Sequence, residues 1–220
     1  MASSTRAASA SGRRGPLSPG RWPSASRRRG RSRGQSLVEF SLVIPLFLTV
    51  ALALIEFAFA FHAVLAVNYA SRTAALLAAE GGNEIGTDCI VLRSIEANIT
   101  APADAARIVQ VEIYQADKNG DMVGTSTIYV RSGTTTCDYG GGTTITVPYT
   151  QTQDGYTEAD RCNVMAGCPD NPGTHTSRDV VGVRIGYHHA WITPLRSFIG
   201  GNPGGLSFDR SNATRMEPVL

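Results

Sequence analysis

Residues 34–56 read Gly34-Gln-Ser-Leu-Val-Glu39-Phe40-Ser-Leu-Val-Ile-Pro45-Leu-Phe-Leu-Thr-Val-Ala-Leu-Ala-Leu-Ile-Glu56, a largely apolar run with an acid near each end. Between Leu42 and Val67 the only polar side chains are those of Thr49, Glu56 and His62. This apolar length exceeds the roughly 20 residues that a helix needs to cross a bilayer. A carboxylate in such a segment is costly unless it has a partner. The stretch therefore predicts one transmembrane helix, with a specific role for Glu39 and for Glu56.

The helical pattern continues past this run. Small apolar residues recur at helical spacing at Ala70, Ala74, Leu77 and Ala78, and Gly81-Gly82 then offers a helix end. Pro45, in the first turns, removes one backbone donor and is expected to kink the helix. We predict a transmembrane and extended helix over residues 35–80.

Charge is distributed unevenly about this helix. All nine basic residues before Gly34 are arginines, so 11 of the 20 basic residues remain against 18 acids, and the rest of the chain carries about −7. Short basic flanks stay on the cytoplasmic side of a membrane helix. We therefore predict a cytoplasmic N-terminus, an extracytoplasmic C-terminus and contact with membrane lipid. A nucleic-acid-binding tail is the alternative; directly before a membrane span we favour lipid headgroups, and expect no nucleic acid partner. Residues 1–34, with few apolar side chains, are predicted to be a disordered basic leader.

Residues 81–220 are predicted to form an extracytoplasmic α+β domain. The pattern indicates a short helix at 90–99 and an antiparallel sheet of four or five strands. The expected strands are 108–114, 126–130, 143–149, 179–190 and 206–216. A hairpin turn is expected at 117–121, where Asn119-Gly120 is a turn signal. Residues 150–176 are polar and rich in turn-forming residues, and we expect a loop there.

The four cysteines all follow the apolar run, at Cys89, Cys137, Cys162 and Cys168. An even number in an oxidising exterior predicts two disulfides, for which three pairings are possible. A bridge between Cys162 and Cys168 is the easy local one. We favour it, with Cys89 bonded to Cys137 and tying the helical region to the sheet.

Chemical sites are poorly supported by the sequence. Asp117, Asn119 and Asp121 resemble the start of a calcium loop, but the twelfth position is Ile128 where a bidentate glutamate is needed. His188 and His189 are adjacent in an expected strand, so they should point to opposite faces and miss a shared ion. No nucleophile or phosphate-loop signature is present in the sequence. We predict no catalytic residue, metal or cofactor, and no enzyme.

A resemblance rests on Gly34, four residues, then Glu39-Phe40 at the head of an apolar helix. This arrangement resembles the processing site of type IVb (Flp-type) prepilins and pseudopilins. The longer stretch from Arg33 to Glu80 resembles the TadE-like family of the tight-adherence pilus system. The ending Arg215-Met-Glu-Pro218 is similar to one common in such proteins.

The resemblance implies a minor pilin or pseudopilin cut by prepilin peptidase between Gly34 and Gln35. Glu39 would then be the fifth residue of the mature chain, and would pair with the N-terminal amine of a neighbouring subunit. For Glu56 two interpretations stand, a contact to a partner pseudopilin within a helix bundle and snorkelling to the outer face of the membrane. The implied partners are other pilins or pseudopilins, the pilus assembly platform and prepilin peptidase.

Two other classes of protein fit the sequence. Ala58-Phe59-Ala60 resembles a signal-peptidase site, and a cut after Ala60 would release a secreted, disulfide-bonded binding domain. An apolar segment of this length is long for a signal peptide. An uncut single-span anchor whose outer domain binds a surface partner is the third interpretation.

Overall fold

The computed structural model describes residues 32–138, 142–164, 168, 178–193 and 204–216. The chain divides into two compact units, Met1–Ile44 and Pro45–Leu220. In the first unit, the described residues are the beginning of helix α1 (Ser32–Gly81), which starts before Gly34. Of the leader predicted to be disordered at residues 1–34, residues 1–31 lie outside the described residues, whereas residues 32–34 belong to α1. Residues 217–218 of the C-terminal motif also lie outside the described residues.

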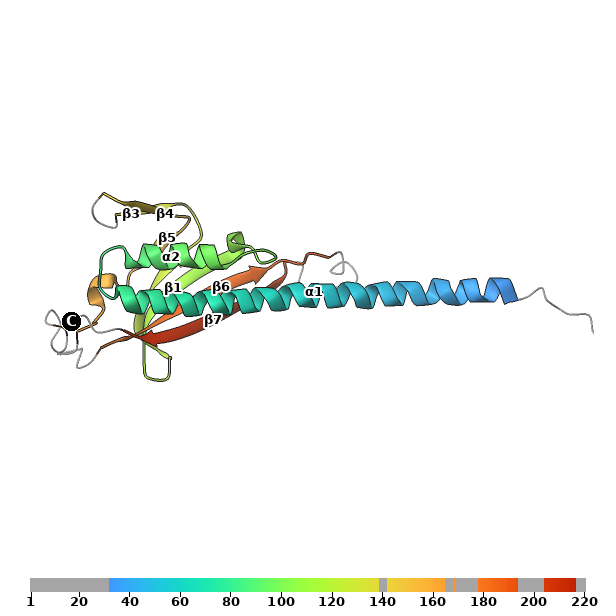
Figure 1. The fold of residues 1–220 in the computed structure, drawn as a ribbon, viewed down its shortest axis with the longest axis horizontal. Coiled ribbons are helices and arrows are strands. Elements are labelled where there is room, and N and C mark those ends of the chain that lie inside the picture. Colours follow the sequence, from blue (N-terminus) through green and yellow to red (C-terminus); the bar gives the residue numbers. More distant parts are fainter. Residues whose placement is uncertain (1–31, 139–141, 165–167, 169–177, 194–203, 217–220) are drawn as a thin grey trace, which may run out of the picture. The chain divides into compact units, whose positions relative to one another are not determined.

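The second unit is built on antiparallel sheets, shown in Figure 1. A five-stranded sheet has the order β5-β2-β1-β6-β7, and a separate two-stranded sheet pairs β3 with β4. The strands are β1 (Ile108–Ala116), β2 (Met122–Val130), β3 (Thr135–Asp138), β4 (Thr144–Val147), β5 (Thr150–Gln153), β6 (Val180–His189) and β7 (Leu206–Arg215). Together with α1 and α2 (Thr87–Asn98) they confirm the predicted α+β class.

Two strand predictions need correction. The strand expected at 143–149 is β4, but it pairs with β3 outside the five-stranded sheet. The fifth member of that sheet is β5, at the start of the segment predicted to be a loop. All four side chains of β5 are polar and exposed, so no hydrophobic alternation signalled it. It forms as an edge strand through its backbone bonds to β2.

Both helices cover one face of the five-stranded sheet (Figure 1). Helix α2 buries Val91, Leu92 and Ile95, which helical spacing places on one face. From Ala63 onward α1 contributes mostly alanines to the same core: Ala63, Val67, Ala70, Ala74, Ala75, Ala78 and Ala79. Small side chains let the backbone of α1 approach its neighbours closely, so the second half of α1 belongs to the folded unit.

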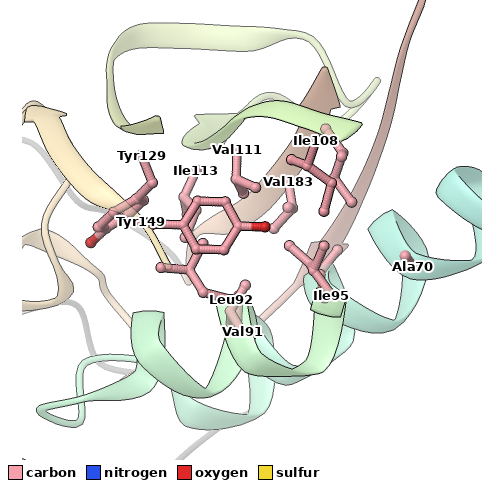
Figure 2. Packing of buried hydrophobic residues seen from close by; sticks show 14 of the residues in the cluster. Ala70, Val91, Leu92, Ile95, Ile108, Val111, Ile113, Tyr129, Tyr149 and Val183 are labelled. Atoms are coloured by element: carbon pink, nitrogen blue, oxygen red, sulfur yellow. The ribbon is translucent and has the colours of Figure 1, made fainter. Parts of the chain in front are cut away.

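The sheet meets the helices through its central strands, β1 and β6. Strand β6 alternates, with Val181, Val183 and Ile185 fully buried. Figure 2 shows Val183 beside Val111 and Ile113 of β1, facing the side chains of α2. The fully buried aliphatic residues of α2 and of these two strands form the centre of the core.

The turn between β1 and β2 is the predicted hairpin. The carboxylate of Asp117 accepts hydrogen bonds from the backbone N–H groups of Asn119 (2.7 Å) and Asp121 (3.0 Å). Gly120 has φ +90°, a conformation that glycine adopts readily. The acidic and amide side chains that resembled a calcium loop therefore have a direct role in shaping this turn.

Candidate functional site: the apolar helix and its acids

The first part of α1 presents only exposed side chains. Every residue from 34 to 50 is exposed, and among the large apolar ones Leu37, Phe40 and Phe47 are more than three-fifths exposed. Among the described residues α1 is the one helix long and apolar enough to cross a membrane. A largely apolar exposed surface of this kind is stable in lipid and costly in water. The helix therefore points to membrane anchoring.

Gly34, Gln35, Glu39 and Phe40 lie in the first turns of this exposed segment. The amide Nε2 of Gln35 donates a hydrogen bond to Oε1 of Glu39, 3.1 Å away and one helical turn further along. Among the described residues, no atom beyond the chain neighbours and the nearby helix backbone lies within 4 Å of the position that a Cβ at Gly34 would occupy. The described residues thus leave free space around Gly34, which lies in the first turn of the helix, where helices fray most easily.

Glu56 lies in a different environment from Glu39. Glu56 is only 2% exposed. Its carboxylate accepts hydrogen bonds from the backbone N–H of Ile192, at 3.0 and 3.2 Å, and from that of Thr193, at 2.7 Å. Nε2 of His189 lies 3.3 Å from Oε1. The acid in the apolar helix therefore finds its partners within its own chain, at the end of β6 and in the segment that follows.

The segment after β6 is fixed at both ends. Nη1 of Arg107, in the short 3₁₀ helix η1 (Ala105–Arg107), donates to the carbonyl oxygen of Ala190 at 2.9 Å. Glu56 holds the next residues by their N–H groups. We call residues 190–193 the β6 exit loop.

His188 and His189 point to opposite sides of β6, as their adjacency predicted. His189 is buried against Glu56, whereas His188 is bonded to Ser207 Oγ (2.9 Å) and to the carbonyl of Gly204 (2.6 Å).

Strand β7 is bonded to α1 further along the helix. Nδ2 of Asn212 donates to Oγ of Ser71 at 2.6 Å and lies 3.3 Å from the carbonyl oxygen of Asn68. Together with the contacts of Glu56, this bond attaches α1 to β6 and β7, the last two strands at one edge of the sheet.

The structure brings both favoured cysteine pairs to disulfide distance, Cys89 with Cys137 and Cys162 with Cys168. Their Cα atoms lie 6.3 and 5.5 Å apart, within the usual range for such bonds. The first joins α2 to β3, so it links a helix to the two-stranded sheet. The second joins two cysteines that are six positions apart in the sequence.

A buried polar cluster lies beside these disulfides. Asp88, in the first turn of α2, pairs with the guanidinium of Arg161 and accepts a hydrogen bond from the hydroxyl of Tyr129 at 2.8 Å. Burial, and next the Asp88 carboxylate, raise the pKa of the Tyr129 phenol, so it keeps the proton that it donates. Glu158 accepts from the N–H groups of Gly86 (2.9 Å) and Asp88 (2.7 Å), which satisfies donors at the start of α2.

The sequence singled out Glu56 but did not identify what it binds. Its partners lie more than 130 residues away and are mainly backbone N–H groups, which carry no sequence signature. His189 was available as a signal, because a histidine beside an apolar strand face suits a buried acid. Arg161 and Asp88 were also missed, since the sequence shows neither burial nor proximity.

Comparison with known proteins gives one match. The family model described as TadE-like protein matches residues 34–76, which confirms the resemblance over this stretch. No curated protein and no solved structure matches the chain. The match supports a function associated with the tight-adherence pilus, and it covers the exposed half of α1 and most of the half that packs on the sheet.

Proposed function

We propose that the chain is a minor pilin or pseudopilin of TadE type that takes part in assembling an Flp-type tight-adherence pilus. The observation that carries this proposal is the coincidence of the family match, residues 34–76, with a helix whose side chains are exposed from its first turn to residue 50. Such a helix suits storage in a membrane and later packing against other apolar helices. The protein acts by this packing, without catalysis.

Prepilin peptidase is the proposed processing enzyme, with cleavage between Gly34 and Gln35. The open surroundings of Gly34 support this site, because a protease must reach the bond from outside the fold. After cleavage Gln35 carries the new amine, one turn from Glu39. The exposed Glu39 carboxylate then pairs with the amine of a neighbouring subunit and sets its axial position, since unpaired charges are unfavourable in a low-dielectric helix bundle.

The proposed topology places the arginine-rich N-terminus in the cytoplasm and residues 81–220 outside. The nine arginines before Gly34 support this orientation. The two disulfides support an oxidising location for the outer part. The proposed partners are membrane lipid, other pilins or pseudopilins and the assembly platform.

The test is the N-terminus of the protein extracted from membranes, determined by intact mass and N-terminal peptide mapping. We expect a chain that starts at Gln35, and an uncut chain in cells that lack prepilin peptidase. Gly34→Val should block processing, because a branched side chain replaces the glycine at the cut. Gly30→Val, a matched change in the leader, should be processed normally.

Other results would replace the proposal. A chain that starts at Phe61 would indicate a secreted domain released by signal peptidase. Such a cut would separate Glu56 from His189 and the β6 exit loop. The contacts in the structure therefore do not favour cleavage after Ala60. An uncut chain in wild-type cells would indicate a plain membrane anchor.

A further inference from the structure

The position of Glu56 along α1 limits where the bilayer can lie. Residues 34–55 form the 22-residue interval between Arg33 and Glu56, and it contains no basic residue and one acid, Glu39. A helix of 22 residues is about 33 Å long, close to the roughly 30 Å of a bilayer's hydrocarbon core. The interval therefore spans the membrane with little excess length at either end.

The β6 exit loop sets the outer limit of the hydrocarbon. Irregular backbone exposed to lipid does not occur within the hydrocarbon region. The loop is bonded to Glu56 through the N–H groups of Ile192 and Thr193, so it lies at the same level of the helix as that acid. Glu56 and the loop must then both lie at or beyond the lipid headgroups on the outer side.

The side chains at this level suit the membrane surface. Ile192 is 49% exposed, and Trp191 beside it is half-buried. On α1, the exposed rings of Phe57 and Phe61 are stacked with centroids 6.3 Å apart. Tryptophan is enriched at membrane–water interfaces, because it combines an apolar body with a polar N–H.

We propose that the β6 exit loop is a membrane-surface contact, in which Trp191 and Ile192 rest among the lipid headgroups next to the point where α1 leaves the bilayer. Glu56 is the positioning residue, because it holds the loop at that depth. The occupant of this surface is lipid, since the same chain's membrane span continues directly into it. This inference needs the helix to span a membrane, and it does not depend on processing or on a pilus.

The chain is suited to a fluorescence test, because its two tryptophans are Trp22 and Trp191. In full-length Trp22→Phe protein, Trp191 is the only tryptophan. The protein is reconstituted into phosphatidylcholine vesicles whose lipids carry bromine either near the headgroup or near the end of the acyl chain. We expect Trp191 to lose much of its fluorescence with the shallow bromines and little with the deep ones.

A matched control moves the tryptophan to just beyond the C-terminal end of α1, away from Glu56. Ile85 is 78% exposed in the turn that follows α1, 29 residues beyond Glu56. In Trp22→Phe/Trp191→Phe/Ile85→Trp protein, neither kind of bromine should quench the tryptophan. Vesicle flotation of each variant establishes that the protein is bound to the vesicles.

Two results would overturn the inference. If the vesicles float with protein and Trp191 is quenched no more than the tryptophan at position 85, the loop faces water or a protein partner, and the proposed pilus function is untouched. If the protein fails to float with the vesicles, the membrane span itself is wrong and the proposed function falls with it.

Discussion

The two ends of the folded unit each bury an acid, and they neutralise it in different ways. Glu56 is 2% exposed and Asp88 is 5% exposed. Glu56 is bonded to backbone N–H groups and to His189, at the end without a disulfide. Asp88 is paired with Arg161, which is 1% exposed, at the end where both disulfides lie.

The difference concerns what remains when each acid is removed. Without Glu56, two N–H groups of a partly exposed loop lose their acceptor, and water can reach them. Without Asp88, a buried cation remains whose Nε and Nη1 already have no hydrogen-bond partner among the described residues. Burial alone would lower the pKa of Arg161, but the Asp88 carboxylate raises it, so the guanidinium stays charged. Backbone N–H dipoles thus stabilise the buried carboxylate of Glu56 at one end of the unit. The opposite charge of Arg161 stabilises that of Asp88 at the other end.

The largest effect should come from Asp88→Ala. Removing one partner of a buried ion pair costs about 3–5 kcal/mol, because the other charge is left uncompensated. Urea denaturation of the detergent-solubilised protein, followed by circular dichroism, measures the loss. Glu84→Ala, at an exposed acid nearby, should change little. Equal losses in the two variants would show that the Asp88–Arg161 pair is unimportant.

The disulfides sharpen the comparison, because both belong to the Asp88 end. The chain-entropy relation gives about 4 kcal/mol for a bridge that spans 48 residues and about 2 kcal/mol for one that spans six. We therefore expect Cys89→Ala/Cys137→Ala to lower the free energy of unfolding more than Cys162→Ala/Cys168→Ala. The same denaturation assay compares the two double variants. A larger loss in Cys162→Ala/Cys168→Ala would contradict this account of the Asp88 end.

Glu56→Ala should have a smaller effect than Asp88→Ala. Hydrogen bonds to a charged acceptor contribute about 1.5–3 kcal/mol, and water can make up part of the loss in this partly exposed loop. Glu56→Gln keeps a carbonyl acceptor and should recover part of the loss. Glu80→Ala, at an exposed acid on the same helix, is the control. Hydrogen exchange of the Ile192 and Thr193 amides gives a local readout, and unchanged protection in Glu56→Ala would refute the contact.

The smallest effect is expected from Asn212→Ala, which removes the short bond to Ser71 and the longer contacts with Asn68. A single intramolecular hydrogen bond contributes about 0.5–1.5 kcal/mol. Ser211→Ala, at the exposed neighbour in β7, should be close to neutral. Denaturation midpoints of the two variants provide the comparison. Indistinguishable midpoints would mean that β7 is attached to α1 by apolar packing alone.

Sequence patterns predicted the long helix and the α+β class, because these follow from local composition and spacing. The favoured cysteine pairing rested only on the closeness of Cys162 to Cys168 in the sequence, which left Cys89 for Cys137. The alternation of β6 and the amphipathic face of α2 were similarly visible. Strand β5 was not, because four exposed polar residues pair only through their backbone. Strand β3 was not predicted either, although it pairs with β4, the next strand along the chain.

Glu39 and Glu56 also separate what the sequence could predict from what it could not. The sequence identified Glu39 and Glu56 as unusual, since each interrupts apolar surroundings. It could not distinguish them, because exposure and burial on one helix are decided by what the rest of the chain brings to it. The contacts of Glu56 come from residues 189, 192 and 193, and only the folded sheet places these beside α1.

The separation between Glu56 and its partners also sets an order of events during synthesis. The ribosome makes Glu56 136 residues before Ile192, so the apolar helix is complete long before its acid can be satisfied. In the proposed topology, a charged Glu56 carboxylate is more stable in water than in lipid during that interval, which would keep this turn of the nascent helix from moving deeper into the membrane. Glu56 would thus limit how far the helix inserts during synthesis. In the folded protein, the same side chain binds the β6 exit loop.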